Sequence, residues 1–329
     1  MSELITDNKQ DDINEILNDD INVENDEKEV SERKDGEIIT APITEYQICS
    51  GEALSCNEIY RIAAKESTKM IVLVGPAGSG KTTIETSIYQ LFQNNPVGKL
   101  YFAGSSTLQG YEQRSFYTRI KSQRDLPATQ RTSLESDHPF LHLRLWEYER
   151  DLIHNLMFAD LSGESFTEHI GQIDAVKEDF SFIDRADYIV GVLDGTRLTN
   201  KRKVRSTVEG VIELVRTFYD AELISEECDL QIVFSKYDSL ATVSDAEQLV
   251  SKVKKQVEKR LEGMFRNVEF FEVAAMPDNI EKFPIGHGLE RLIESWLKNR
   301  NNKLVRKNPE FAELSEFDRL YNKFLGVKV

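Results

Sequence analysis

The sequence predicts an α/β fold, in which a doubly wound and mostly parallel sheet carries helices on both faces. Three observations predict it. An apolar run at residues 69–74 is followed by a glycine-rich loop and then by apolar residues at helical spacing. Strand-like and helix-like segments alternate along most of the remaining chain, which is typical of parallel sheets. A hydrophobic content of 40% in 329 residues is enough for a large core.

The expected elements follow one another regularly. Apolar and β-branched runs predict strands at residues 69–74, 99–104, 140–146, 155–161, 187–193, 230–234 and 268–274. Helical spacing of apolar residues predicts helices at residues 57–66, 83–92, 107–122, 166–183, 201–219, 245–263 and 288–299. The run at 140–146 alternates apolar with polar residues, so this strand is expected to be half-exposed.

Acidic residues are concentrated at the beginning of the chain. Residues 1–40 contain fourteen Asp or Glu and four Lys or Arg, a net charge of −10 out of −16 for the whole sequence. Residues 1–44 are therefore expected to form a disordered leader. Residues 45–302 are expected to form the main domain, with an insertion at about 99–137, and residues 303–329 a helical tail. The acidic balance argues against nucleic-acid binding.

The cysteine content and the lack of signal-like or membrane-spanning segments predict a cytoplasmic protein. Three scattered cysteines without metal-ligand spacing are typical of a reducing compartment. The first residues lack the basic and apolar regions of a secretory signal. No apolar run reaches the roughly 18–20 residues that a membrane span requires. The five histidines also lack metal-ligand spacing, so no metal other than Mg²⁺ is expected.

A phosphate-binding P-loop stands between the first expected strand and the helix that follows it. Residues 75–82 fit the pattern G-x-x-x-x-G-K-[ST]. Glycines let successive backbone N–H groups turn inward, and the helix N-terminus adds partial positive charge. Lys81 is expected to contact the β- and γ-phosphates, and the Thr82 hydroxyl to bind Mg²⁺. The residues expected to surround the nucleotide phosphates are Gly75, Ala77, Gly78, Ser79, Gly80, Lys81, Thr82 and Thr83.

A second motif follows the strand expected at 155–161. It has the form D-x-x-G, with Asp160 and Gly163 as its fixed residues. Asp160 is expected to hold Mg²⁺, usually through water. The Gly163 N–H is expected to reach the γ-phosphate and to sense its loss. The motif is short, but its place at a strand end after a P-loop favours this interpretation.

The base is expected to be read at the next strand ends. The strand at 230–234 ends in S-K-x-D, and the Asp238 carboxylate can accept both N1–H and N2–H₂ of guanine. The stem of Lys236 would lie along the base, and Ser235 would tie this loop to the P-loop. Small residues end the last strand, so the backbone of Ala274 and Ala275 can approach guanine O6. Together these motifs at successive strand ends predict a GTPase-type site.

These motifs resemble the TRAFAC class of G domains, which are P-loop GTPases. The chain resembles, more specifically, the bacterial double-GTPase type-two family. This resemblance rests on the sequence F-A-D-L-S-G-E at 158–164 and on the inserted strand and helix at 100–122. The resemblance covers about residues 68–300. It implies a G-domain fold, bound GTP or GDP, Mg²⁺, and an association with bacterial conflict and defence systems.

Three features depart from a compact G domain. Asp160 comes 79 positions after Lys81, so the region of switch I is enlarged. Ser235 replaces the usual Asn or Thr, which keeps a hydroxyl. Glu164 follows the D-x-x-G motif, where many relatives place a water-orienting Gln. A carboxylate there could act as a base toward the attacking water, although it would repel the γ-phosphate.

The switch-I residues are placed between the P-loop and the strand at 140–146. Thr132 is preferred to Thr129 as the threonine that completes Mg²⁺ coordination when GTP is bound. Arg131 is a candidate internal arginine finger, since a guanidinium can offset charge in the transition state. The alternative is that Arg131 is an ordinary solvated loop residue.

The predicted function is a Mg²⁺-dependent GTP-binding and GTP-hydrolysing switch that hydrolyses slowly by itself. Its partner would be an effector or regulatory protein, encoded nearby, and neither a nucleic acid nor a membrane. Two other classes stay open. A P-loop ATPase or nucleotide kinase would share the phosphate site but would not need Asp238. An interaction module would bind GTP structurally with little turnover.

Overall fold

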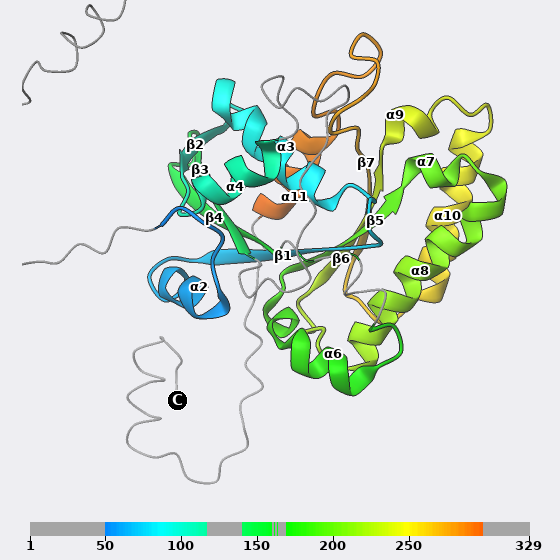
Figure 1. Cartoon of the computed structure of the whole chain (residues 1–329), viewed down its shortest axis with the longest axis horizontal. Helices are drawn as coiled ribbons and strands as arrows, with labels where there is room; N and C mark the ends of the chain where they lie inside the picture. The colour runs from blue at the N-terminus through cyan, green and yellow to red at the C-terminus, as the bar shows by residue number, and fades with distance from the viewer. Residues whose placement is uncertain (1–49, 117–139, 160, 162, 164–168, 299–329) are drawn as a thin grey trace, which may run out of the picture. The chain divides into compact units, whose positions relative to one another are not determined.

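Seven strands form one sheet in the computed structural model, in the order β2-β3-β4-β1-β5-β6-β7 (Figure 1). Their bounds are β1 Thr68–Val74, β2 Leu100–Gly104, β3 Phe140–Glu147, β4 Leu152–Ala159, β5 Tyr188–Asp194, β6 Asp229–Ser235 and β7 Val268–Glu272. β3 runs antiparallel to its neighbours β2 and β4. The strands from β4 through β1, β5 and β6 to β7 pair in parallel. The prediction of a mostly parallel α/β sheet is confirmed.

The structure describes residues 50–116, 140–159, 161, 163 and 169–298. All of them belong to one compact unit, Ile48–Val329. The expected leader, the part of the expected insertion after residue 116 and the expected tail lie outside the described residues.

Helices cover both faces of this sheet (Figure 1). The helices are α2 Cys56–Ala63, α3 Lys81–Asn94, α4 Leu108–Ser115, α6 Ile173–Asp179, α7 Gly195–Leu198, α8 Lys201–Asp220, α9 Tyr237–Leu240, α10 Ala246–Arg260 and α11 Leu289–Leu297, with a 3₁₀ helix at Ser181–Arg185. Two of them, α7 and α9, are single turns that directly follow β5 and β6. Neither turn was expected, because four residues are too few to show a helical period.

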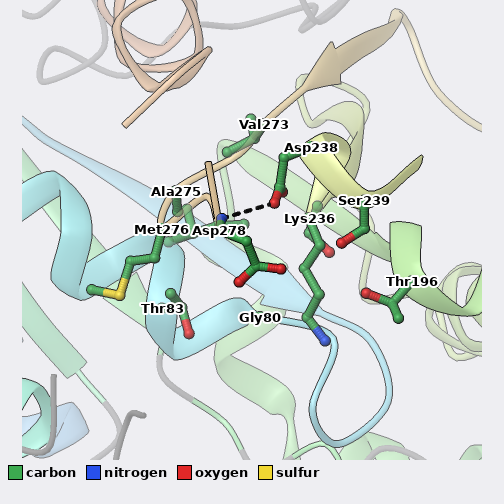
Figure 2. Close-up of a pocket in the computed structure, with 12 residues that line it drawn as sticks. Gly80, Thr83, Thr196, Lys236, Asp238, Ser239, Val273, Ala275, Met276 and Asp278 are labelled. Carbon is green, nitrogen blue, oxygen red and sulfur yellow. Dashed lines mark hydrogen bonds between the residues drawn. The ribbon is translucent and has the colours of Figure 1, made fainter. Parts of the chain in front are cut away.

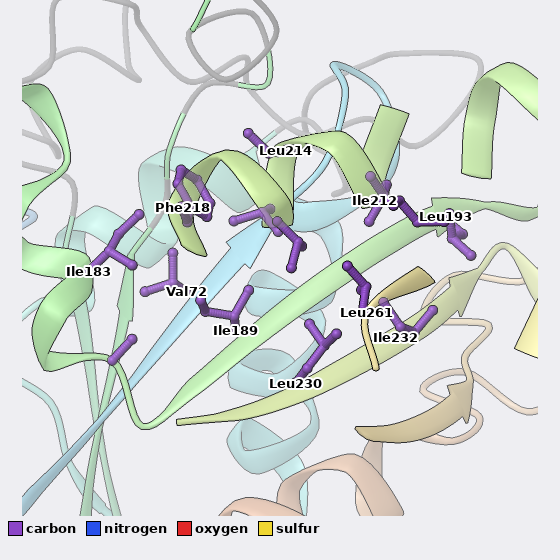
Figure 3. Packing of buried hydrophobic residues seen from close by; sticks show 14 of the residues in the cluster. Val72, Ile183, Ile189, Leu193, Ile212, Leu214, Phe218, Leu230, Ile232 and Leu261 are labelled. Atoms are coloured by element: carbon purple, nitrogen blue, oxygen red, sulfur yellow. The ribbon is translucent and has the colours of Figure 1, made fainter. Parts of the chain in front are cut away.

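One core lies between the sheet and helices α6, α8 and α10 (Figure 3). Helix α8 turns an apolar stripe, including Ile212 and Phe218, toward β5 and β6. Ile189 of β5 and Ile232 of β6 are fully buried beneath it. Burying both faces of the central strands explains why they read as continuous apolar runs.

The second core lies on the opposite face, against helices α3, α4 and α11. Trp296 of α11 is fully buried, and its ring stands 5.5 Å from that of Phe158, centroid to centroid. Its indole N–H donates to Gln231 Oε1 at 2.7 Å, which satisfies a polar group buried in the sheet. Tyr89 of α3 stacks on Tyr111 of α4 at 4.7 Å, so the inserted helix supports the helix that begins at the P-loop.

Two expectations about elements were wrong. The single helix expected at 166–183 is absent from the described part of that range, which contains a turn, α6 and a separate 3₁₀ helix. Gly171 has φ +79°, a backbone conformation that does not continue a right-handed helix. Val176, Phe180 and Ile183 of this segment still face the core, whereas Ile170 and Ile173 are exposed.

The strand β3 is almost wholly buried rather than half-exposed. It lies between two strands, and its polar His142 is only 4% exposed. The imidazole Nδ1 accepts a hydrogen bond from the Ser106 N–H at 3.0 Å, and Nε2 lies 3.1 Å from Asn155 Oδ1. A polar side chain can thus occupy a buried face when the neighbouring strand and loop satisfy it.

The parallel strands β1, β5, β6 and β7 all end at the same edge of the sheet. In an open α/β sheet, ligands bind outside the carboxyl ends of such strands. Val74, Asp194, Ser235 and Glu272 are the last residues of these four strands. The loops that follow them form the candidate site.

Candidate nucleotide-binding site

The P-loop has the backbone conformation that its glycines were expected to supply. Gly75, Gly78 and Gly80 have φ values of +152°, +75° and +98°. A Cβ on Gly75 would stand 2.8 Å from the carbonyl oxygen of Val192 on the adjacent strand β5. At this position a side chain is therefore excluded both by the backbone angle and by the neighbouring strand.

The loop surrounds a positive charge and an unsatisfied hydroxyl. Lys81 is only 7% exposed, and its Nζ donates to the carbonyl oxygens of Gly75 at 2.8 Å and Pro76 at 3.4 Å. Ser79 Oγ is buried and has no hydrogen-bond partner among the described residues. A buried donor of this kind is normally paired. A bound anion would accept from both groups, so the loop fits a phosphate chain.

The first turn of α3 suits an anion as well. It contains no acidic residue, and a helix N-terminus favours negative charge. Thr82 lies in this turn, where its carbonyl accepts from Thr86 Oγ1 at 2.8 Å. Thr83, one residue later, lines the pocket described below.

The glycine of the D-x-x-G motif lies directly on the P-loop. Gly163 is buried, and a Cβ added to it would stand 2.3 Å from the Ala77 nitrogen and 2.5 Å from the Pro76 carbonyl carbon. Only a residue without a side chain allows the two backbones to approach this closely. The motif and the phosphate loop are therefore in direct contact at Gly163 and Ala77.

Ser235, at the end of β6, connects the P-loop with the end of strand β5. Its hydroxyl donates to the Ser79 carbonyl at 2.6 Å and also lies 3.1 Å from the Leu193 carbonyl at the end of β5. The residue is 3% exposed. The expected connection between the S-K-x-D segment and the P-loop is thus present, with an additional contact to β5.

Lys236 makes the same kind of connection one residue later. Its Nζ donates to the Gly78 carbonyl at 2.8 Å and to Asp194 Oδ2 at 3.0 Å. Its backbone is left-handed, with φ +48°, which is uncommon for a residue other than glycine. This conformation ends β6 and begins the turn α9, in which Asp238 lies.

A pocket of about 250 Å³ opens between the P-loop and the S-K-x-D segment (Figure 2). Asp238 and Lys236 face it from one side, and Gly80 and Thr83 border it on the side of the P-loop. Asp238 Oδ2 accepts from the Asp278 N–H at 3.2 Å, which fixes one carboxylate oxygen. The other residues lining the pocket are Ile84, Thr196, Ser235, Ser239, Val273, Ala275, Met276 and Asp278.

The two alanines after β7 have different positions. Ala275 lines the pocket. Ala274 does not, and its N–H donates to the His287 carbonyl at 3.0 Å. The backbone beside the pocket is held by a further bond, from the Gly286 N–H to the Ala275 carbonyl at 3.0 Å.

Asp194, Thr196 and Asp278 are among the residues of this site that were not predicted from the sequence. Asp194 is 6% exposed and ends β5, and its Oδ1 accepts from the backbone N–H groups of Thr196 and Arg197. The signal was available, since D-G-T follows an apolar strand as the other motifs do. Asp278 offered no such signal, because it lies in a loop that only the fold brings to Asp238.

Several predicted site residues lie outside the described residues. They are Asp160, Glu164, Arg131 and Thr132, together with Thr129. Of the expected Mg²⁺ ligands, only Thr82 can therefore be placed. Within the described ranges there is no group of three or more His, Cys, Asp or Glu that could hold a metal ion. No helix in those ranges is both long and apolar enough to cross a membrane.

The comparisons with known proteins agree with the motifs. A sequence model of the family Double-GTPase 2 matches residues 69–297. The chain belongs to this family. The match begins in the strand before the P-loop and ends with α11, so every described residue of the site lies within the matched range. The resemblance drawn from the motifs, and with it a G-domain type of α/β fold, is confirmed.

Two solved structures are similar in part. One is a signal recognition particle receptor SRb-GTP/SRX complex from Chaetomium thermophilum, with 17% identity, a TM-score of 0.36, and coverage of 70% of this chain and 99% of that one. The other is a bacterial selenocysteine-specific elongation factor EF-Sec, with 15% identity, a TM-score of 0.36, and coverage of 72% of this chain and 30% of that one. No curated protein matches the sequence.

Proposed function

We propose that this protein binds GTP with Mg²⁺ and hydrolyses it to GDP and phosphate. One observation carries the proposal: a single pocket is bordered by the phosphate loop on one side and by the Asp238 carboxylate on another. Membership of the Double-GTPase 2 family supports it. The pocket volume of about 250 Å³ suits a purine base, with the phosphates continuing into the P-loop.

The Asp238 carboxylate would distinguish guanine from adenine by its charge and by the direction of its hydrogen bonds. An ionised carboxylate is a pure acceptor, and guanine presents two adjacent donors, N1–H and N2–H₂, where adenine presents an acceptor at N1. Asp238 would take both donors, while the Asp278 N–H holds one of its oxygens in place. The aliphatic stem of Lys236 crosses the pocket toward Gly78 and offers an apolar surface to the base (Figure 2).

The phosphates would lie in the P-loop. Lys81 would leave the Gly75 and Pro76 carbonyls and turn to the phosphate oxygens, and the Ser79 hydroxyl would donate to them. Thr82, Asp160 and Thr132 would hold Mg²⁺, which when bound neutralises charge that builds up on the phosphates. These groups stabilise charge on the transferring phosphoryl group, which is the main catalytic need in this reaction.

Water would attack the γ-phosphate in line with the leaving group. Glu164 would orient or deprotonate that water, Gly163 would donate its N–H to the γ-phosphate, and Arg131 would act as an internal arginine finger. Gly163 already lies against the P-loop at Ala77, on which the phosphates would rest. Loss of the γ-phosphate would remove these contacts and change the segment after Gly163.

The output would be a change in affinity for a partner protein, in the manner of a molecular switch. Differential contacts in the two nucleotide states would bias that affinity. The family resemblance favours an effector or regulator in a bacterial defence system, encoded nearby, and a cytoplasmic location. The acidic sequence opposes nucleic-acid partners.

Competitive binding tests the proposal. Purified protein with Mg²⁺ is titrated with GTP, GDP and ATP, and the Asp238→Ala variant is titrated in the same way. We expect a guanine preference of about tenfold or more, equivalent to about 1.4 kcal/mol, that the variant loses. Equal affinity for ATP in the wild type, unchanged in the variant, would overturn the proposal in favour of a P-loop ATPase. Guanine binding without any phosphate release would favour the interaction module.

A further inference from the structure

Two consecutive residues at the end of β6 use the same pattern of contacts. Ser235 links the Ser79 carbonyl of the P-loop to the Leu193 carbonyl of β5. Lys236 links the Gly78 carbonyl of the P-loop to the Asp194 carboxylate of β5. In each case one side chain bridges the phosphate loop and the end of β5. The second bridge is the stronger one electrostatically, because both ends of the Lys236–Asp194 contact are charged.

Asp194 is built into the fold more firmly than Lys236. Its side chain is 8% exposed, whereas that of Lys236 is 40% exposed. Oδ1 of Asp194 accepts from the Thr196 N–H at 3.0 Å and the Arg197 N–H at 3.4 Å, which caps the short helix α7. Oδ2 is left to face the Lys236 ammonium group at 3.0 Å. The two backbone hydrogen bonds thus fix the orientation of the carboxylate independently of its contact with the lysine.

The backbone nearby keeps these two groups together. A Cβ on Gly195 would stand 2.4 Å from the Ser235 carbonyl oxygen and 2.7 Å from that of Lys236. The loop after β5 therefore packs directly on the loop after β6. Since Asp194 immediately precedes Gly195, this close approach sets the distance between the carboxylate and the lysine.

We infer that Asp194 is a positioning residue for nucleotide binding: it holds Lys236 across the mouth of the base pocket and against the P-loop. The inference rests on the proposed function, in which the stem of Lys236 lies along the base. Asp194 is not among the residues that line the pocket, so it would act through the lysine rather than on the nucleotide. A lysine without this partner would sample many rotamers, and each binding event would then cost the entropy of ordering its side chain.

The Asp194→Asn variant separates the ion pair from the helix cap. Asparagine keeps an oxygen that can accept from the Thr196 and Arg197 N–H groups, and Asn is also a good N-cap residue. Its amide N–H₂ would face the Lys236 ammonium group, so the attraction is lost and two donors oppose each other. We expect GDP affinity to fall about tenfold, mainly through faster dissociation, with a nearly unchanged melting temperature of the nucleotide-free protein.

Asp229→Asn is a matched control. Asp229 is also a nearly buried aspartate in an ion pair, with its side chain 10% exposed and its Oδ2 3.2 Å from Arg266 Nη2. It begins β6, at the end of the strand opposite to the pocket. This variant should alter stability and leave GDP affinity within about twofold of the wild type.

A double-mutant cycle decides whether Asp194 acts through Lys236. Lys236→Met keeps most of the stem and removes the charge. If the inference holds, the double variant binds GDP no more weakly than Lys236→Met alone. Losses that add in the double variant, an unchanged affinity in Asp194→Asn, or an equal loss in Asp229→Asn would each overturn it. If the wild type binds ADP as tightly as GDP, the proposed function fails, and the same cycle measured with ADP still tests Asp194.

Discussion

The Ser235 hydroxyl donates a hydrogen bond of 2.6 Å to the Ser79 carbonyl, across 156 positions of sequence. The bond joins the loop expected to read the base to the loop expected to hold the phosphates. Both residues are buried, at 3% and 1% exposure, so water cannot replace either partner. Recognition of the two halves of a nucleotide therefore depends on one shared packing arrangement.

Ser235→Ala should destabilise the protein by about 1–3 kcal/mol, because the buried Ser79 carbonyl loses its donor. Chemical denaturation measures the change. GDP affinity should fall in the same variant, since the P-loop loses one of its two side-chain connections to the S-K-x-D segment. Ser235→Thr keeps the hydroxyl and should retain most of both properties. A Ser235→Ala protein with wild-type stability and affinity would contradict this prediction.

Asp238→Asn should weaken GTP binding by at least about tenfold and improve the relative affinity for xanthosine triphosphate. The substitution replaces one acceptor by a donor, and xanthine offers a carbonyl where guanine has its 2-amino group. Competition titrations with the two nucleotides give the ratio. Asp220→Asn, an exposed change at the end of α8, serves as the control and should leave the ratio unchanged. Parallel losses for both nucleotides would mean that Asp238 does not read the base.

Gly163→Ala should reduce affinity for a non-hydrolysable GTP analogue more than affinity for GDP. The added methyl group would stand 2.3 Å from the Ala77 nitrogen, so the D-x-x-G segment must withdraw from the P-loop. Loss of one hydrogen bond to a charged phosphate costs about 1.5–3 kcal/mol, which is about tenfold or more in affinity. Gly210→Ala is the matched control, because nothing lies within 4 Å of a Cβ there. Equal losses for both nucleotides would argue against a γ-phosphate contact.

His142 should make stability depend on pH. Burial lowers the pKa of His142 below its usual value of 6.5, although the hydrogen bond with Asn155 acts in the opposite direction. The unfolded chain then binds a proton that the folded protein does not, so stability is complete above about pH 6.5 and is lost as pH falls toward the lowered pKa. Urea denaturation at about pH 7.5 and about pH 5.5 measures the loss. His142→Gln cannot titrate and should lose less stability over this range; an identical pH dependence would contradict the assignment.

The sequence was most informative where one short segment carries a complete physical pattern. The P-loop is an example, because its glycines and the following helix start are adjacent in the chain. The helix expected at 166–183 shows the limit. The apolar spacing there predicted one helix, but it did not show the break that a positive φ at Gly171 introduces. Likewise, alternation at β3 could not reveal that His142 is buried within a polar network.

For this protein the sequence by itself determined the class of fold, the phosphate loop, the S-K-x-D segment and the family. Each depends on residues that are neighbours in the chain. Only the tertiary structure decided that β2 lies at the edge of the sheet, that Gly163 contacts Ala77, and that Asp278 holds the Asp238 carboxylate. It also placed Asp194 beside Lys236. These contacts join segments far apart in sequence, and their geometry is set by the packing of parallel strands rather than by any local pattern.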